Sequence, residues 1–140
     1  MAESVMTYLV NEAGLADKFV IASAAAHTDE IGNQPHRGTR EKLAREGIPL
    51  VPHRARLLTR ADGEKFDYLI GMDVWNVRDM KKILGEEYAH KVSMLLDFTA
   101  RPGAIADPWY TGNFDETFAD VMEGCTALLN TIAKREGWSK

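Results

Sequence analysis

The segment FDYLIGMDVWNVRDMKKILG, residues 66–85, decides the fold class of this chain. Residues 66–72 form an apolar run with little polar alternation, which is typical of a strand covered on both faces. Residues 74–84 then place side chains three and four positions apart along one side, and Gly85 follows where such a helix would end. That side carries Val74, Val77, Met80, Lys81 and Leu84. The segment therefore predicts a strand followed directly by a helix.

The alternation of strand and helix continues over the rest of the chain. Apolar runs at residues 19–22 and 92–96 predict two further strands. Alternation of this kind implies right-handed crossovers and a parallel sheet covered by helices. We expect an α/β fold, a doubly wound parallel sheet flanked by helices, in a single domain over residues 1–140. The other helical patterns lie at residues 2–13, 37–46 and 114–132.

The composition of the chain already argues against binding to nucleic acid or to a membrane. The chain has 140 residues and a net charge of −4, with no basic stripe for nucleic acid or an anionic membrane. No apolar run approaches the roughly 20 residues of a membrane-spanning helix, and the start of the chain does not resemble a signal peptide. We therefore expect a cytoplasmic protein that binds neither nucleic acid nor membrane.

Two long segments, residues 25–36 and 99–112, fit neither strand nor helix and are expected to be functional loops. The second contains Asp107, which precedes a proline and so has a restricted backbone that can aim its carboxyl group. Trp109 and Tyr110 follow and could form the walls of a slot for a flat group. An ordinary Asp-Pro turn anchored by two aromatic rings is the alternative.

In their order along the chain, these motifs resemble the low-molecular-weight protein tyrosine phosphatase family almost from end to end. No single motif is specific, but their collinear order is. The motifs are Met1-Ala2-Glu3-Ser4-Val5, Phe19-Val20-Ile21-Ala22-Ser23-Ala24, Gly32-Asn33-Gln34-Pro35, His53-Arg54-Ala55-Arg56, Phe66-Asp67-Tyr68, Met72-Asp73 with Asn76, Asp107-Pro108-Trp109-Tyr110, and Phe114 to Gly124-Cys125.

The resemblance implies hydrolysis of phosphotyrosine protein or a small aryl phosphate through a phosphocysteine intermediate. In that family a Cys-x5-Arg loop supplies the nucleophile and holds the phosphoryl oxygens. Asp107 takes the place of the general acid that protonates the leaving phenolate. Trp109 and Tyr110 match the aromatic walls of the substrate site. The family uses no cofactor and no metal.

Three further residues match positions that support the site in the family. His53 matches a histidine that supports the phosphate loop, although a surface or turn histidine is an equal alternative. Asp73 and Asn76 match a pair at a strand end, and a helix N-cap at Asp73 explains half of that match equally well. A metal site is not expected, because no spacing of the histidines and carboxylates matches a ligand pair.

The chain departs from the family pattern at its nucleophile, because it contains no Cys-x5-Arg sequence. Its one cysteine, Cys125, lies on the apolar side of a predicted helix, where a cysteine is usually a core residue. One cysteine also excludes the disulfide relay of arsenate-reducing relatives.

We therefore expect an N-terminally truncated phosphatase that is inactive alone. Met1 would then be an internal methionine of a longer protein, taken as the start of the reading frame or set by the boundary of the expressed segment. The alternative is a natural, non-catalytic form that acts by self-association or phospho-ligand binding.

Truncation of this kind would remove a central strand of the resembled sheet. A buried strand of about five residues carries several apolar side chains, each worth roughly 1.5–3 kcal/mol. Its loss would leave the runs at residues 19–22 and 66–72 without partners, and bare strand edges invite pairing. We expect the chain to self-associate through these edges, or to rearrange so that the two runs pair directly.

Overall fold

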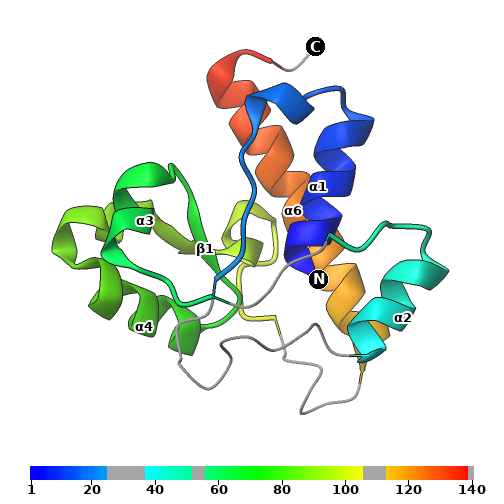
Figure 1. Ribbon diagram of the computed structural model, residues 1–140, viewed down its shortest axis with the longest axis horizontal. Coiled ribbons are helices and arrows are strands. Elements are labelled where there is room, and N and C mark those ends of the chain that lie inside the picture. Colours follow the sequence, from blue (N-terminus) through cyan, green and yellow to red (C-terminus); the bar gives the residue numbers. More distant parts are fainter. Residues whose placement is uncertain (25–36, 52–55, 106–112, 139–140) are drawn as a thin grey trace.

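The computed structural model describes residues 1–24, 37–51, 56–105 and 113–138 (Figure 1). The helices of these ranges are α1 (Ala2–Glu12), α2 (Arg37–Arg45), α3 (Arg60–Lys65), α4 (Val74–Leu84) and α6 (Phe114–Glu136). The strands are β1 (Leu69–Gly71) and β2 (Val92–Met94), and the short 3₁₀ helices are η1 (Ala16–Lys18), η3 (Glu86–Lys91) and η4 (Leu95–Phe98). None of the helices in these ranges is long and apolar enough to cross a membrane.

The two strands form a parallel sheet, with Leu69 opposite Val92 and Gly71 opposite Met94. Helix α4 connects them, as the sequence of residues 66–85 predicted. Both strands are shorter than the apolar runs that contain them, and β2 ends at Met94 because the chain turns directly into η4. The parallel α/β architecture is confirmed, with two strands in the described part of the chain.

Helices cover both faces of this sheet. Side chains of α1, α2, α6 and η4 form the larger hydrophobic cluster, against which Ile70 packs. Leu69, the neighbour of Ile70 in β1, points into a smaller cluster with Leu58, Met80 and Leu84. Successive residues of β1 therefore contact different cores, which explains why the run has no polar alternation. Figure 1 shows α1 and α6 side by side on one side and α3 and α4 on the other.

The ends of α4 follow from its sequence. The Asp73 carboxylate caps the first turn, and Gly85 ends the helix with a φ of 83° that a residue with a Cβ rarely adopts. The sequence pattern placed Val74 on the buried side of this helix, which is wrong: Val74 is 64% exposed. Its first-turn position extends beyond the core, whereas Met80 and Leu84 are buried.

The expected strand at residues 19–22 is also absent from the structure. After η1 the chain is extended, with Phe19 at φ −124° and ψ 141°, but it pairs with no strand among the described residues. An extended segment becomes a strand only when another backbone pairs with it, and a groove separates this segment from β1. The direct pairing of the two runs, which we gave as one consequence of a missing strand, is therefore not present in the described chain.

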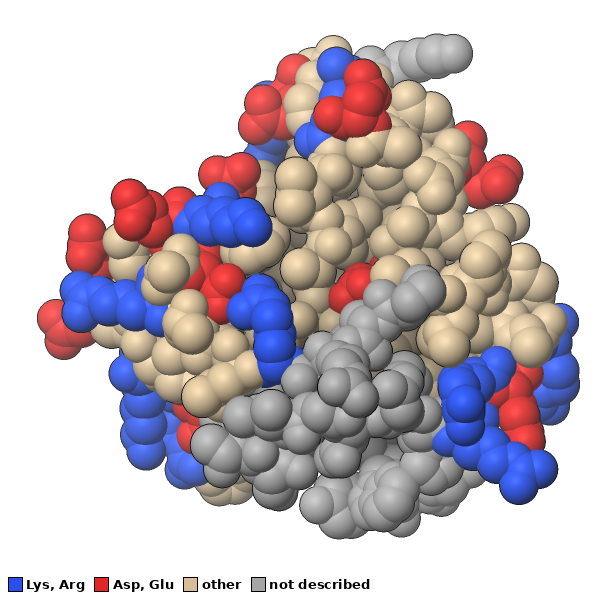
Figure 2. All heavy atoms as spheres, in the orientation of Figure 1, with Lys and Arg blue, Asp and Glu red and all other residues tan. Residues whose placement is uncertain are grey.

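Charge is distributed unevenly over the face drawn in Figure 2. Lys, Arg, Asp and Glu side chains gather over the part that contains α3 and α4, near α2 and at the top of the view, and uncharged side chains make up most of the upper central area.

Candidate functional site

Two of the six candidate site residues lie within the described ranges. Asp73 and Asn76 are placed by the structure, at the start of α4. Asp107, Trp109 and Tyr110 fall in residues 106–112, and His53 falls in residues 52–55, all outside the described residues. The roles assigned to these four from the sequence stay predictions.

Asp73 and Asn76 form one hydrogen-bonded unit at the carboxyl end of β1. The backbone N–H of Asn76 donates to Oδ1 of Asp73 at 2.7 Å, which is the N-cap bond of α4. Oδ1 of Asn76 in turn accepts from the backbone N–H of Met72 at 3.1 Å. The helix N-cap interpretation of Asp73 is confirmed, and Asn76 ties the helix back to the end of the strand.

A second connection at this edge was not foreseen from the sequence. The backbone N–H of Ile105 donates to the carbonyl of Met72 at 2.8 Å, and the Ile105 side chain is buried. The chain therefore enters residues 106–112 from the carboxyl end of β1. Open parallel sheets bind ligands at this edge, so the predicted acid segment begins where such a fold places its site.

Arg56, the last residue of the His53-Arg54-Ala55-Arg56 motif, makes a two-pronged ion pair. Its guanidinium donates to the two carboxylate oxygens of Asp62 at 3.0 and 3.1 Å. Asp62 is buried, and its pKa is lowered, first by the hydrogen bond from Arg56 and further by the N–H of Thr59. The sequence reasoning missed this pair; the Thr59-x-x-Asp62 spacing, which is that of a helix capping box, could have indicated the role of Asp62 at the helix start but not its partner Arg56.

An exposed aromatic ring lies next to the Asp73–Asn76 unit. Trp75 is 64% exposed, and the Arg78 guanidinium lies over its ring at 4.5 Å from the ring centroid. Arg78 also approaches Asp79 at 3.6 Å. The sequence pattern gave no reason to single out Trp75, because surface rings in a first turn have no characteristic spacing.

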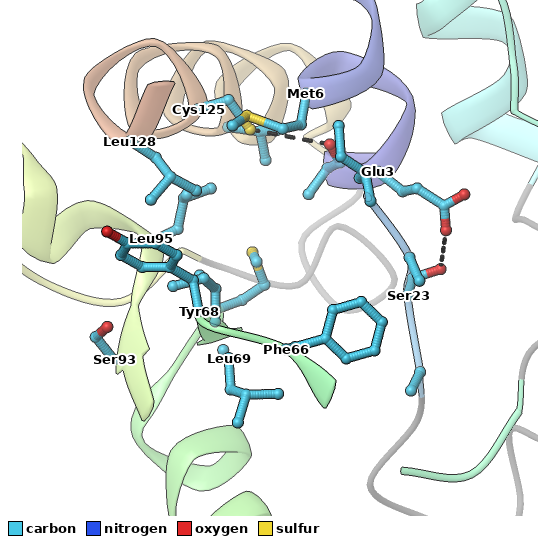
Figure 3. Close-up of a pocket in the computed structure, with 18 of the residues that line it drawn as sticks. Glu3, Met6, Ser23, Phe66, Tyr68, Leu69, Ser93, Leu95, Cys125 and Leu128 are labelled. Atoms are coloured by element: carbon cyan, nitrogen blue, oxygen red, sulfur yellow. Dashed lines mark hydrogen bonds between the residues drawn. The ribbon is translucent and has the colours of Figure 1, made fainter. Parts of the chain in front are cut away.

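Cys125 is a core residue, as the sequence suggested. It is 2% exposed within α6, and its Sγ lies 3.9 Å from the carbonyl oxygen of Ala2 (Figure 3). Burial raises the pKa of the thiol to about 12. A nucleophilic cysteine needs the thiolate form and access to substrate, and Cys125 has neither.

A groove of about 1220 Å³ opens beside the strand-end residues. Met72, Asp73 and Asn76 line one part of it, and the rest extends along β1 toward α1 and α6. In the described ranges no group of three or more His, Cys, Asp or Glu side chains is placed to hold a metal ion.

The fold and this edge define a class of protein: an α/β domain whose polar groups gather at the carboxyl end of a parallel strand, with helices on both faces. The family model described as low molecular weight phosphotyrosine protein phosphatase matches residues 1–137. This chain belongs to that family.

Known relatives agree with this assignment. The low molecular weight protein-tyrosine-phosphatase YfkJ of Bacillus subtilis is 36% identical over 138 residues, covering 97% of this chain and 88% of YfkJ. The YfkJ crystal structure superposes with a TM-score of 0.91 over 96% of this chain and 86% of that one. A protein tyrosine phosphatase from Entamoeba histolytica gives a TM-score of 0.86 at 26% identity, over 97% of this chain and 88% of that one.

Proposed function

We propose that this domain serves the hydrolysis of phosphotyrosine in proteins, or of small aryl phosphates, with Asp107 as the general acid. The family membership and the names of its relatives support this substrate class. The main geometric support is the hydrogen bond from Ile105 to Met72. It fixes the chain two residues before Asp107 next to the strand end where Asp73 and Asn76 lie. Cytoplasmic action stays a prediction from the sequence.

The chemistry assigns separate tasks to the residues of this chain. As the bond between phosphorus and the phenolic oxygen breaks, the phosphoryl group passes to a cysteine thiolate and Asp107 gives its proton to the leaving phenolate. The same carboxylate then takes a proton from the water that hydrolyses the phosphocysteine. Trp109 and Tyr110 hold the phenyl ring between them. His53, Asp73 and Asn76 support the loops around the phosphate.

The nucleophile of this reaction is not among the 140 residues. The sequence contains no Cys-x5-Arg, and Cys125 is a buried thiol with a pKa of about 12. The proposal therefore includes that the 140-residue chain alone does not turn over phosphate esters, and that activity needs a phosphate loop joined to it.

Steady-state hydrolysis tests this in two forms of the protein: the 140-residue chain, and a chain extended before Met1 through the upstream codons of the same frame. We expect no turnover of p-nitrophenyl phosphate or phenyl phosphate by the shorter chain, and turnover of both by the extended one. Turnover by the shorter chain would overturn the assignment of the nucleophile. An extended chain with a Cys-x5-Arg loop but no turnover would overturn the enzymatic proposal.

The acid role of Asp107 has its own test in the extended chain. General acid catalysis contributes about 10²–10⁴-fold, and its contribution is larger when the leaving group is more basic. Asp107→Asn should therefore lower kcat/KM, which reports the step in which the leaving group departs, far more for phenyl phosphate than for p-nitrophenyl phosphate. Equal losses for the two substrates would mean that Asp107 acts on structure and not on the leaving group.

A second candidate function is non-catalytic, as a module that self-associates or binds a phosphorylated ligand. The unpaired edge of β1, which has one partner strand in the described chain, favours association. Light scattering of the 140-residue chain at micromolar concentration tests it. A stable dimer without phosphatase activity in the extended form would favour this candidate, whereas a monomer would exclude self-association.

A further inference from the structure

The exposed side chains of α4 all lie on one side of the helix. At about 100° per residue they fall within roughly 120° of its circumference. We call this side the outer face of α4; its residues are Val74, Trp75, Arg78, Lys81 and Lys82. The opposite side carries Met80 and Leu84, which are buried in the smaller hydrophobic cluster. Figure 1 shows α4 at the edge of the molecule, away from α1 and α6, so the outer face is open to a partner.

The first turn of the outer face is apolar. Val74 and Trp75 are each 64% exposed, and they are two of the four large hydrophobic side chains that are exposed in the described part of the chain. A single exposed apolar side chain is ordinary, whereas neighbouring ones mark a surface that contacts something else. Tryptophan is also among the residues that contribute most to binding at protein interfaces.

The rest of the outer face is basic. Arg78, Lys81 and Lys82 are exposed, and no ion pair joins either lysine to another described residue. Asp79, the one acidic residue of α4, lies outside this face and approaches Arg78 at 3.6 Å. The next acidic residue in sequence, Glu86, follows the end of the helix. The face is therefore positive on a chain whose net charge is −4.

Stabilisation of the helix explains only part of this pattern. Lys81 and Lys82 lie in the last turn, where basic side chains interact favourably with the helix dipole. That effect gives no reason for Arg78 in the middle of the helix or for an exposed ring in its first turn. The Arg78 guanidinium lies 4.5 Å from the centroid of the Trp75 ring, so the ring is already held in place at the surface.

The outer face begins at the candidate site. Asp73 caps α4 and Asn76 bonds to Met72, and all three residues line the groove at the carboxyl end of β1. From Val74 to Lys82 the helix extends about 12 Å, at 1.5 Å per residue. An extended chain covers that length with about four residues. The apolar part of the face is thus nearest to the site, and the basic part is farthest from it.

We propose that the outer face of α4 binds the segment that flanks the phosphorylated residue in a phosphotyrosine protein. An apolar side chain of that segment contacts Val74 and Trp75, and acidic side chains farther along pair with the basic part. The proposal rests on the proposed function, because the phosphotyrosine in the site brings the segment to this face. Three basic side chains on an acidic chain are too few for the phosphate backbone of a nucleic acid.

Phosphopeptide kinetics in the extended chain test the proposal. The two substrates are phosphotyrosine followed by Gly-Leu-Asp-Glu-Glu and the same residues in reverse order, and the matched controls carry Asn-Gln-Gln in place of Asp-Glu-Glu. At low ionic strength we expect kcat/KM of the better acidic peptide to exceed that of its control about tenfold. High salt should reduce this preference, because exposed ion pairs are screened. Equal kcat/KM for acidic and neutral peptides in both orders would overturn the proposal.

Charge-reversal variants locate the effect on α4. Lys81→Glu combined with Lys82→Glu should abolish the preference and create one for a peptide with three lysines in place of the acids. Lys65→Glu combined with Lys134→Glu makes the same charge change at exposed positions of α3 and α6, and should keep the original preference. Trp75→Ala should lower kcat/KM for acidic and neutral peptides alike, since both contain leucine. Turnover of p-nitrophenyl phosphate, which is too short to reach this face, normalises each variant. A preference that survives the Lys81 and Lys82 changes, or that is lost equally in the control, would contradict the assignment.

The 140-residue chain tests the face without turnover. Millimolar Leu-Asp-Glu-Glu peptide, blocked at both ends, should shift the amide resonances of α4 and the indole N–H resonance of Trp75, and the neutral peptide should shift them much less. Should the extended chain fail to hydrolyse p-nitrophenyl phosphate, the proposed function fails and this titration alone decides the binding face. Absence of shifts in α4 would overturn the proposal. Shifts in α4 that depend on protein concentration without peptide would do the same, by assigning the face to a second copy of the chain.

Discussion

The backbone N–H of Ile105 donates a hydrogen bond of 2.8 Å to the carbonyl of Met72. Met72 also donates its own N–H to Asn76, so one residue directly after β1 holds both the following helix and the segment that leads to Asp107. Two parts of the chain about 30 residues apart in sequence are thus fixed to one point. A change at Asn76 should consequently affect both hydrogen bonds of Met72, the one to α4 and the one from Ile105.

Asn76→Ala tests this connection. It removes the acceptor of the Met72 N–H, and we expect a loss of about 0.5–1.5 kcal/mol in the free energy of unfolding, measured by urea denaturation. Amide exchange should accelerate at Met72 and at Ile105. Asn76→Asp keeps an acceptor oxygen and is the matched control, with slower exchange at both amides than in the alanine variant. Unchanged exchange at Ile105 in Asn76→Ala would show that the two bonds are independent.

The helices were the most predictable part of the fold, because their signals are local. Val74–Leu84 was predicted with its observed bounds, since Asp73 and Gly85 mark its ends in the sequence itself. Residues 19–22 were wrongly predicted as a strand, because pairing depends on a backbone distant in sequence that no local pattern can report. The prediction that these residues are extended was right, but the prediction that they pair with a neighbouring strand was wrong for the described chain.

The candidate site was predictable in its residue types but not in its connections. Asp73 carried a helix N-cap signal, and Asn76 was found only through the family resemblance. Neither the Arg56–Asp62 pair nor the bond from Ile105 has a spacing in sequence that identifies it, because both depend on how separate segments pack. Asp107 remains a prediction that rests on the family pattern.

Arg56 and Asp62 give a prediction about acid stability. The pKa of Asp62 is lowered in the folded state, so the pair contributes stability above the ordinary carboxyl pKa of about 3.9, and this contribution is lost as the pH falls through the lower folded value. Arg56→Ala leaves a buried carboxylate with a weaker set of partners. Because the Arg56 side chain is 44% exposed, we expect a loss of only about 1–2 kcal/mol at pH 7.

Urea titrations at pH 7 and pH 3 separate charge from geometry at this pair. The difference in stability between the unchanged chain and Arg56→Ala should shrink at pH 3, where more of the Asp62 carboxyl is protonated. Arg56→Lys keeps the charge but cannot form the two parallel bonds, and should lie between the two. A difference that is the same at both pH values would mean that Arg56 acts through packing alone.

Cys125 should be almost unreactive while the chain is folded. With a thiol pKa of about 12, roughly one molecule in ten thousand carries the thiolate at pH 8, and the sulfur is also shielded from reagent. We expect reaction with a disulfide reagent at pH 8 to be at least a hundredfold slower than in 6 M guanidinium chloride. Rapid labelling of the folded chain would contradict the burial of this side chain.

The same raised pKa predicts a loss of stability at alkaline pH. The unfolded thiol ionises near pH 8.5, whereas the folded thiol stays neutral until about pH 12. Between these values the unfolded state releases a proton that the folded state keeps, so this cysteine lowers the stability as the pH rises. Cys125→Ala removes the titrating group, and its free energy of unfolding should fall less between pH 8 and pH 10 than that of the unchanged chain.

Gly124 of α6 faces Leu95 of η4, and its substitution tests how tightly the two elements pack. A Cβ at this position would lie 2.5 Å from Cγ of Leu95, a side chain that is 1% exposed. Alanine has a higher helix propensity than glycine by about 1 kcal/mol, so Gly124→Ala would stabilise α6 if the contact were loose. Overpacking of a filled core costs about 1–3 kcal/mol, and we expect it to outweigh this gain.

Asn130→Ala, at an exposed position of the same helix, is the control and should be neutral or slightly stabilising. A Gly124→Ala variant as stable as that control would mean that α6 can shift away from Leu95, and that the wall of the groove formed by α6 is adjustable.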